Sequence, residues 1–348
     1  MSASPGRDLL LRLPKAELHC HLDGSVRAST LLDLAAEQGS TMPRTTAAEL
    51  ADFMLVRDAR SLEEYLARFD VTLSVMQTES ALERIAYELA IDAAAEGVRY
   101  LEIRYCPTLN QRRGLDLGAT IEAPLRGLAR AERETGIVAR TIVTALRGNS
   151  PAESQRMAQL AAEYRSRGVV GFDLAGGELG FPASAHEQAF QLAREHDMAC
   201  TCHAGEGDGA QSVREAVHRC GAHRIGHATR LIEDPELVEF VADRQIALEI
   251  CLTSNVQTRV ASSYDVHPFR RYFDEGLNVV LNTDNRLMSG VSLTDEYVAA
   301  ATHLDFTMDE LCDVALNGFQ SAFLPWKERQ ALLDRVTPEI DALRAYDA

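Results

Sequence analysis

The fold of this chain is decided by the stretch Ala16-Glu17-Leu18-His19-Cys20-His21, a short apolar run that ends in two histidines. Successive side chains of a β-strand point to opposite faces, so residues i and i+2 share a face. A strand here therefore aims both imidazoles at one point, as two ligands of one metal ion must be aimed. Because His-x-His pairs also recur by chance, the interpretation depends on the rest of the chain.

Runs of the same kind recur along the chain, with stretches of helical apolar spacing between them. The strand-like runs are Ala16–His21, Val98–Tyr105, Ile137–Leu146, Val169–Ala175, Met198–His203, Arg224–His227, Ile246–Cys251 and Leu277–Thr283. The helical stretches include Leu82–Ala95, Ser154–Ser166, Ala185–Glu195 and Pro235–Asp243. This alternation predicts an α/β fold, a (β/α)8 TIM-type barrel. A doubly wound open sheet is the alternative, but no Gly-x-Gly-x-x-Gly follows the first run.

The first βα unit is oversized, with room for roughly three helices between His21 and Val98 where one crossover would suffice. We expect extra helices inserted after the first strand, over residues 30 to 80, in a single domain that spans residues 1 to 348. Four apolar residues there share one helical face: Leu62, Tyr65, Leu66 and Phe69. This face either packs on the barrel or forms a flap over its mouth, and the sequence favours neither.

Composition limits the classes of partner. The 348 residues are 46% hydrophobic and carry a net charge of −17, which disfavours nucleic acid or an anionic membrane as the main partner. The seven cysteines lie mostly in apolar runs, which indicates buried thiols in a reducing compartment rather than a Cys-x-Cys zinc site at Cys200 and Cys202. No signal peptide or membrane span is seen, so we expect a cytoplasmic protein.

Polar residues gather where the predicted strands end, and in a barrel all these ends meet at one rim. The seventh run leads into Thr253-Ser254-Asn255, and the fourth into Gly176-Gly177-Glu178. The other residues at these ends are His19, His21, His203, Glu206, His227, Asp284 and Asn285. The remaining histidines are expected at the surface or at helix ends: His186, His196, His218, His223, His267 and His303.

Four of the rim residues form a donor set of three nitrogens and one carboxylate oxygen, which suits zinc: His19, His21, His203 and Asp284. Zinc with an open coordination position lowers the pKa of water to ~7. Glu206 follows His203 by three residues, where it would act as an acid of raised pKa. His227 would orient or deprotonate the attacking water, and Asp284 would also hold its proton. This pattern predicts hydrolysis by a metal-activated water.

Several segments together resemble the adenosine deaminase family in their order and spacing. The segments are Glu17–Ser25, Tyr65–Asp70, Asp173–Gly176, His203–Glu206, Arg224–His227 and Asn282–Asp284. The likeness runs from about Pro14 to past Asp284, nearly the whole chain. The family's best-known members carry two successive aspartates after the eighth strand, and this chain has Asn285 at the second position.

The resemblance implies a barrel with one zinc ion per chain that replaces the C6 amino group of a purine by hydroxyl and releases ammonia. Glu206 would then protonate ring nitrogen N1, and the backbone of Gly176 would donate to N3. Asp23 would accept a hydrogen bond from a ribose hydroxyl, and Asn285 would donate to N7 through its amide. His227 and Asp284 would handle the hydroxide, and the flap would be lined by Leu62, Tyr65, Leu66 and Phe69.

We expect a small purine nucleoside as substrate, adenosine or 2′-deoxyadenosine. Adenine or another adenosine-containing metabolite is the alternative, and a broader metal-dependent amidohydrolase is a second. Two-metal hydrolases often use a bridging lysine, but Lys15 and Lys327 are the only lysines and neither ends the fourth strand. A purine-binding protein without catalysis would show damage at Glu206 or a ligand, and none is seen. The sequence leaves the oligomeric state open.

Overall fold

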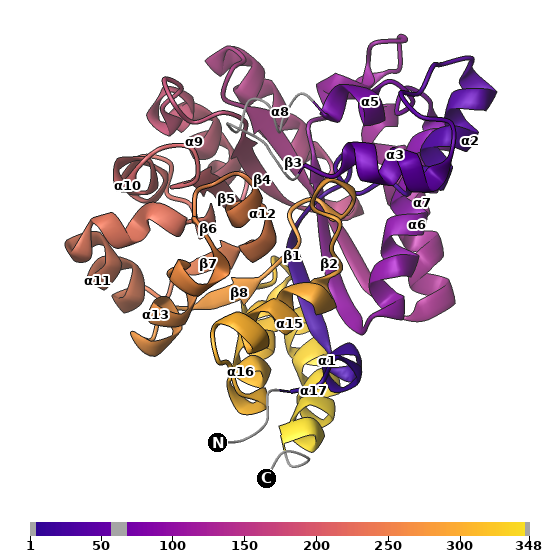
Figure 1. The fold of residues 1–348 in the computed structure, drawn as a ribbon. Coiled ribbons are helices and arrows are strands. Elements are labelled where there is room, and N and C mark those ends of the chain that lie inside the picture. The colour runs from indigo at the N-terminus through magenta and orange to yellow at the C-terminus, as the bar shows by residue number, and fades with distance from the viewer. Residues whose placement is uncertain (1–4, 57–67, 345–348) are drawn as a thin grey trace.

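The computed structural model describes residues 5–56 and 68–344. Within them the predicted barrel is confirmed: eight parallel strands pair in chain order and nearly close on themselves (Figure 1). Their bounds are β1 Lys15–His21, β2 Val98–Tyr105, β3 Val138–Leu146, β4 Val169–Ala175, β5 Ala199–Ala204, β6 Arg224–His227, β7 Ala247–Ile250 and β8 Val279–Leu281. The strands β2, β4 and β6 match their predicted runs from end to end, whereas β8 is shorter than the run Leu277–Thr283.

The barrel closes between its first and last strands through a short seam. The amide of His21 donates to the carbonyl of Asp284 at 2.7 Å, and the amide of Asp284 donates to the carbonyl of His19 at 3.0 Å. Below them, the Asn282 side-chain oxygen accepts the amides of Leu18 (2.7 Å) and His19 (3.1 Å). A side chain thus satisfies buried amides that would otherwise lack partners.

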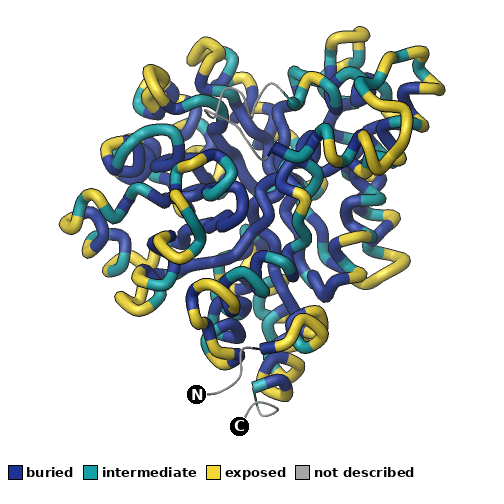
Figure 2. The backbone as a smooth tube through the Cα atoms, in the orientation of Figure 1, coloured by how far each residue is buried: buried dark blue, intermediate teal, exposed yellow. Residues whose placement is uncertain are grey.

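Helices cover the outside of the barrel. The strands are buried, and the exposed residues lie mainly on the outer faces of the helices and on the loops (Figure 2). The helices include α6 Glu79–Ala95, α7 Leu117–Thr135, α8 Pro151–Glu163, α9 Glu187–Glu195, α10 Ala210–His218, α11 Pro235–Asp243, α12 Leu252–Gln257, α13 Phe269–Asp274 and α16 Met308–Ser321. The helix α8 ends at Glu163, before the predicted Ser166, because a 3₁₀ turn (η2, Arg165–Arg167) leads into Gly168, whose φ is +110°. Only glycine adopts such a φ readily.

The extra helices predicted after the first strand are present as α2 Ala28–Gln38, α3 Ala47–Met54 and α5 Phe69–Leu73. Of the four predicted flap residues, Leu62, Tyr65 and Leu66 lie outside the described residues, and Phe69 begins α5.

The remaining helices are α1 Arg7–Arg12, α14 Arg286–Ser289, α15 Leu293–His303 and α17 Trp326–Arg344. In the described part of the chain, no helix has the length and apolar character needed to cross a membrane.

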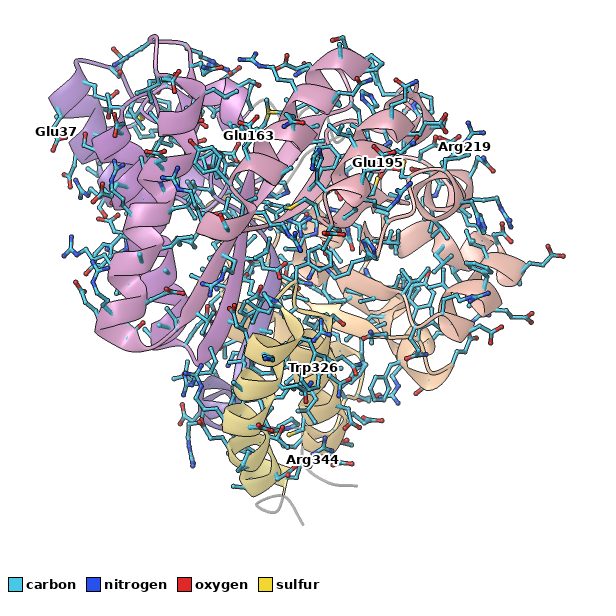
Figure 3. The ribbon with its side chains drawn as sticks, turned by 180° about the vertical axis from the view of Figure 1, so that it is seen from behind. Glu37, Glu163, Glu195, Arg219, Trp326 and Arg344 are labelled. Carbon is cyan, nitrogen blue, oxygen red and sulfur yellow. The ribbon has the colours of Figure 1, made fainter. Side chains whose placement is uncertain are left out.

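Charged side chains project from the outer helices, among them Glu37, Glu163, Glu195 and Arg219 (Figure 3). Inside, all seven cysteines are buried and unpaired, which confirms the prediction that they act as small core residues. The core also contains buried ion pairs. Glu249 on β7 accepts hydrogen bonds from Arg104 (2.9 Å) and Arg224 (2.7 Å). Such a buried carboxylate is tolerated only because its charge is paired.

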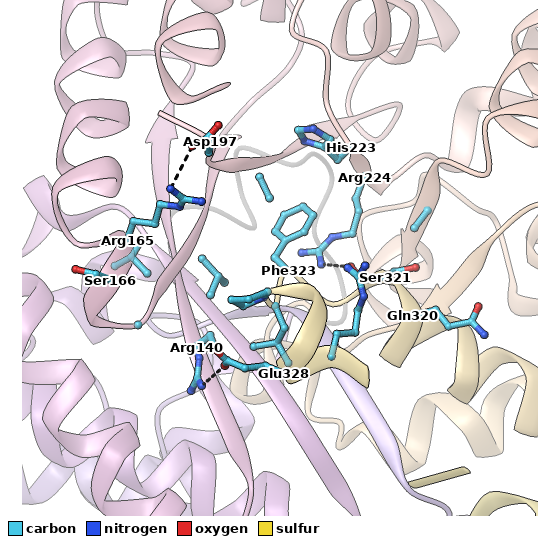
Figure 4. A pocket seen from close by; sticks show the side chains of 18 of the residues that line it. Arg140, Arg165, Ser166, Asp197, His223, Arg224, Gln320, Ser321, Phe323 and Glu328 are labelled. Carbon is cyan, nitrogen blue, oxygen red and sulfur yellow. Dashed lines mark hydrogen bonds and ion pairs between the residues drawn. The ribbon is translucent and has the colours of Figure 1, made fainter. Parts of the chain in front are cut away.

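A second cavity, of about 860 Å³, lies at the amino-terminal ends of several strands, around Phe323 (Figure 4). Its arginines already have partners: Arg140 contacts Glu328 at 3.3 Å, and Arg165 contacts Asp197 at 3.4 Å. This cavity contains none of the polar residues at the strand carboxyl ends. It is therefore separate from the candidate site.

Candidate active site

The structure brings together the four predicted metal ligands. His19 and His21 come from β1, His203 from β5 and Asp284 from the segment after β8, and their ligand atoms all lie within 4.8 Å of one another. The Nε2 atoms of His21 and His203 are 3.1 Å apart, and each of the Nε2 atoms of His19 and His21 is 3.4 Å from Asp284 Oδ1. Four ligands placed tetrahedrally around zinc have atoms about 3.3–3.4 Å apart. The cluster therefore has the donor set and spacing of a zinc site.

Carboxylates behind two of these histidines fix which ring nitrogen faces the cluster. The Nδ1 atom of His19 contacts Glu249 Oε2 at 2.9 Å, and that of His203 contacts Asp173 Oδ1 at 3.1 Å. An ionised carboxylate only accepts, so each Nδ1 carries the proton and each Nε2 presents a lone pair. The Nε2 of His19 is buried and makes no hydrogen bond to the described residues, a costly state unless it binds a metal.

The electrostatics of Glu249 support that arrangement. Burial opposes its ionisation, but Arg104 and Arg224 hold the pKa of Glu249 well below its usual value. A further donor reaches the other side of the cluster: the Ser254 hydroxyl donates to Asp284 Oδ2 at 2.7 Å. Asp284 also has a φ of +60°, a left-handed conformation that aspartate tolerates better than most residues.

Glu206 lies beside the cluster without belonging to it. Burial raises the pKa of Glu206 well above its usual value, and the negative charges of Asp284 and Glu178 raise it further. Its Oε2 is 3.5 Å from Nε2 of His227. A carboxyl group in this environment keeps its proton at neutral pH and can give it to a substrate.

The turn that carries Glu206 is held by Glu178, to which the sequence assigned no role. The Glu178 carboxylate accepts the backbone amides of Gly205 (3.1 Å), Glu206 (2.9 Å) and Gly207 (3.2 Å). Three amides converging on one buried carboxylate form an anion-binding nest. The only sequence signal was the Gly-Gly-Glu that follows β4.

His227 ends β6 at the edge of the cluster, with its ring centroid 4.9 Å from that of His19. Burial lowers the pKa of His227 well below its usual value, so the imidazole is neutral. Its Nδ1 atom contacts the Asn255 amide nitrogen at 3.0 Å. Asn255 was visible in the sequence only as part of Thr253-Ser254-Asn255 after the seventh strand.

The cluster opens into a cavity of about 420 Å³, a size typical of small-molecule sites. Asp23, Phe69, Gly176 and Asn285 line it together with His21, His203, Glu206, His227 and Asp284. Burial raises the pKa of Asp23 to about 7, and the Phe69 ring lies edge-on to His21 with centroids 6.4 Å apart. Every predicted site residue within the described ranges therefore lines this cavity, except His19, which lies directly behind it.

Two of the other histidines are buried. His186 and His267 lie at helix ends, as expected, and both are enclosed by other parts of the fold. His186 contacts the Ser154 hydroxyl at 2.8 Å, and His267 contacts Asn255 Oδ1 at 3.1 Å. Their partners come from other elements, so no local sequence pattern could reveal them.

Comparison with known proteins agrees with this geometry. The family model described as adenosine deaminase matches residues 14–339. An adenosine deaminase of Mycobacterium ulcerans is 40% identical over 354 residues, covering 97% of both chains. A probable adenosine deaminase of Dictyostelium discoideum is 42% identical over 318 residues, which cover 91% of this chain but only 41% of that longer protein.

Solved structures with the same fold include an amidohydrolase from Burkholderia ambifaria with bound zinc, at a TM-score of 0.89 and 28% identity, covering 100% of this chain and 98% of the other. An adenine deaminase from Arthrobacter aurescens has a TM-score of 0.88 at 28% identity, covering 94% and 99%. An Arabidopsis N6-mAMP deaminase has a TM-score of 0.83 at 30% identity, covering 95% and 99%. Since the family model spans nearly the whole chain and full-length relatives share about 40% identity, this protein belongs to the adenosine deaminase family.

Proposed function

We propose that this protein hydrolyses adenosine and 2′-deoxyadenosine to inosine and 2′-deoxyinosine, with release of ammonia. One observation carries the proposal: a three-histidine, one-aspartate cluster and a buried, protonated Glu206 open into the same cavity of about 420 Å³. Hydrolysis of an aromatic amine requires a hydroxide and an acid on the same substrate, and these groups can provide both. Full-length relatives named adenosine deaminase support the choice of reaction.

We propose one zinc ion per chain, held by His19, His21, His203 and Asp284. Zinc bound there would supply hydroxide near neutral pH by lowering the pKa of water. The family relative solved with zinc and the spacing of the four donor atoms support this choice of metal. The site is contained in one domain over residues 1 to 348, with the helical insertion as its flap.

Glu206 gives its proton to ring nitrogen N1, which withdraws electrons from C6 and opens that carbon to attack. Asp284 takes part in holding the attacking hydroxide, while its second oxygen is kept in place by the Ser254 hydroxyl. His227, 3.5 Å from Glu206, faces the same reacting atoms. The proton on Glu206 is available because burial disfavours the ionised carboxylate.

The purine and the sugar are bound by the cavity lining. Gly176 donates its backbone amide to N3, and Asn285 donates its side-chain amide to N7, which an asparagine does at every pH. Phe69 covers the ring from the α5 side. Asp23, buried and without a hydrogen bond to its Oδ1 among the described residues, accepts a ribose hydroxyl.

Asp23 also supports a nucleoside over the free base as the substrate. Free adenine would leave the buried Oδ1 atom of Asp23 without a partner, which costs about 1–3 kcal/mol. The structural relatives named adenine deaminase and N6-mAMP deaminase make adenine and 5′-phosphorylated adenosines the competing substrates. The chain's seven unpaired, buried cysteines support action in a reducing compartment such as the cytoplasm.

The test is a substrate panel on the zinc-loaded protein. Adenosine and 2′-deoxyadenosine should lose the adenine absorbance and release ammonia, with kcat/KM well above that for adenine or adenosine monophosphate.

The variant Glu206→Gln should keep one zinc and lose at least about 100-fold in kcat, while Glu195→Gln on the exposed end of α9 should match the wild type. Absence of turnover of every adenosine derivative would refute deamination. Preference for adenine would refute the role of Asp23.

A further inference from the structure

We propose that Asn255 fixes the tautomer of His227 so that the Nε2 atom carries the proton and faces the reacting atoms as a hydrogen-bond donor. The inference rests on the proposed function for its chemical meaning, but its geometry stands independently. It concerns Asn255, Thr229 and His267, three buried residues that do not line the cavity.

The assignment begins at a backbone amide, whose role as a donor cannot change. The amide of Phe269, at the start of α13, donates to Nδ1 of His267 at 3.1 Å. Burial lowers the pKa of His267 to about 3, so this ring is neutral and carries a single proton. Since Nδ1 accepts, the proton must be on Nε2. His267 therefore donates from Nε2 to its partner 3.1 Å away, the Oδ1 atom of Asn255.

The same oxygen of Asn255 accepts a second donor. The Thr229 hydroxyl, just after β6, donates to Asn255 Oδ1 at 2.9 Å. With two donors converging on it, the position of the carbonyl oxygen is determined, and the NH₂ group must occupy the opposite side of the amide. That NH₂ group lies 3.0 Å from His227 Nδ1 and donates to it.

His227 thus differs from the histidines of the cluster in the partner of its Nδ1 atom. His19 and His203 meet carboxylates there, so their Nε2 lone pairs are free to bind a metal. His227 meets a donor, so its Nδ1 atom must be bare and the proton of the ring must lie on Nε2. A protonated Nε2 cannot bind a metal or accept a proton. This explains how a fourth histidine can lie 4.9 Å from His19, ring to ring, without joining the donor set.

The tautomer also decides between two roles for His227. A bare Nε2 could deprotonate the attacking water, whereas Nε2–H can only donate a hydrogen bond to the oxygen that attacks. His227 therefore orients that oxygen and stabilises its negative charge, and the proton of the water leaves to a carboxylate. Asn255 is accordingly a positioning residue.

Ring-nitrogen NMR of the zinc-loaded, ¹⁵N-histidine-labelled protein tests this directly, because two-bond ¹H–¹⁵N correlations distinguish the tautomers. The signals of His227 are identified by their loss in His227→Gln. The wild type should show protonated Nε2 and bare Nδ1 at His227, the opposite of His19 and His203. A wild-type spectrum with protonated Nδ1 and bare Nε2 at His227 would overturn the inference.

The variant Asn255→Asp supplies the matched perturbation, because an aspartate of the same shape accepts where the amide donates. It should move the His227 proton to Nδ1 and lower kcat by at least about 100-fold, since a catalytic histidine in the wrong tautomer can lose on the order of 10⁴. The control is Asn278→Asp, at the opposite end of the barrel, which should change neither. An unchanged His227 spectrum in folded Asn255→Asp would contradict the proposal. The spectrum needs no turnover, so an inactive wild type with the expected tautomer would refute the proposed function alone.

Discussion

At the scale of single residues, the protonation states of Glu206 and His227 depend on neighbours that do not line the cavity. Glu178 is the strongest example after Asn255, because its carboxylate collects three successive amides of the turn that carries Glu206. It acts in two ways. It holds the backbone of the turn in place, and its negative charge helps to raise the pKa of Glu206.

The substitution Glu178→Gln should therefore affect both the rate and its pH dependence. One acceptor oxygen is lost, and we expect kcat on adenosine to fall roughly 10- to 100-fold while the zinc content stays at one per chain. Removing the negative charge lowers the pKa of Glu206. Because the reaction needs protonated Glu206, the alkaline limb of the kcat profile should move to lower pH.

The matched control for this experiment is Glu187→Gln, whose carboxylate contacts only the exposed Arg219 at 2.7 Å in the described structure. It should show the wild-type rate and profile. If Glu178→Gln lowers kcat but leaves the alkaline limb unmoved, the electrostatic part of this account is wrong and Glu178 acts only through the backbone.

At the scale of elements, β6 is the place where a strand must approach the cluster closely. A methyl group added at Gly226 would lie 3.0 Å from Cε1 and 3.2 Å from Nδ1 of His19, and 3.3 Å from the His203 backbone. The His19 ring can move aside only by straining the contact between its Nδ1 atom and the buried Glu249. The absence of a side chain at Gly226 therefore leaves room for the His19 ring beside β6.

We expect Gly226→Ala to displace the His19 ring. The free energy of unfolding should fall by about 1–3 kcal/mol, and zinc affinity should fall roughly 10- to 100-fold. Competition with a chelator of known affinity measures the second quantity, and denaturant titration measures the first. The control Gly6→Ala adds its methyl group where nothing lies within 4 Å. Wild-type zinc affinity in Gly226→Ala would show that β6 yields instead of the ring.

The strands and the residues at their ends could be predicted from the sequence because both follow from local periodicity. Alternation placed His19 and His21 on one face, and the shared rim of a parallel barrel placed His203, His227 and Asp284 near them. What stayed hidden depends on contacts between distant segments. The bonds from Glu178 to the Glu206 turn, from His267 to Asn255 and from Asn282 to β1 join residues with no common pattern, and they form only when the barrel is assembled.

At the scale of the whole molecule, buried ionisable groups outside the site link stability to pH. Glu296 on α15 accepts the amide of Thr253, at the start of α12, at 3.2 Å. Burial raises the pKa of Glu296 to about 7, from its usual 4.5. Between these two values the unfolded chain has lost a proton that the folded chain keeps, so the free energy of unfolding falls as pH rises.

Glu296→Gln should remove this dependence. Relative to the wild type, the variant should gain about 3 kcal/mol between pH 4.5 and pH 7, since the pKa difference is about 2.5 units. Urea titrations of both proteins at matched zinc concentration across that range give the comparison. A constant difference across that range would mean that folding does not raise the pKa of Glu296.

The position of the metal cluster at the seam links metal binding to closure of the barrel. His19 and His21 lie on the first strand and Asp284 lies in the segment that follows the last strand, on the two sides of the seam. An ion held by all three would clasp the beginning of the barrel to its end, across most of the length of the chain. A nascent chain that still lacks its eighth strand carries at most part of this binding site. Tight metal binding would then require that the eighth strand has been synthesised and that the barrel has closed.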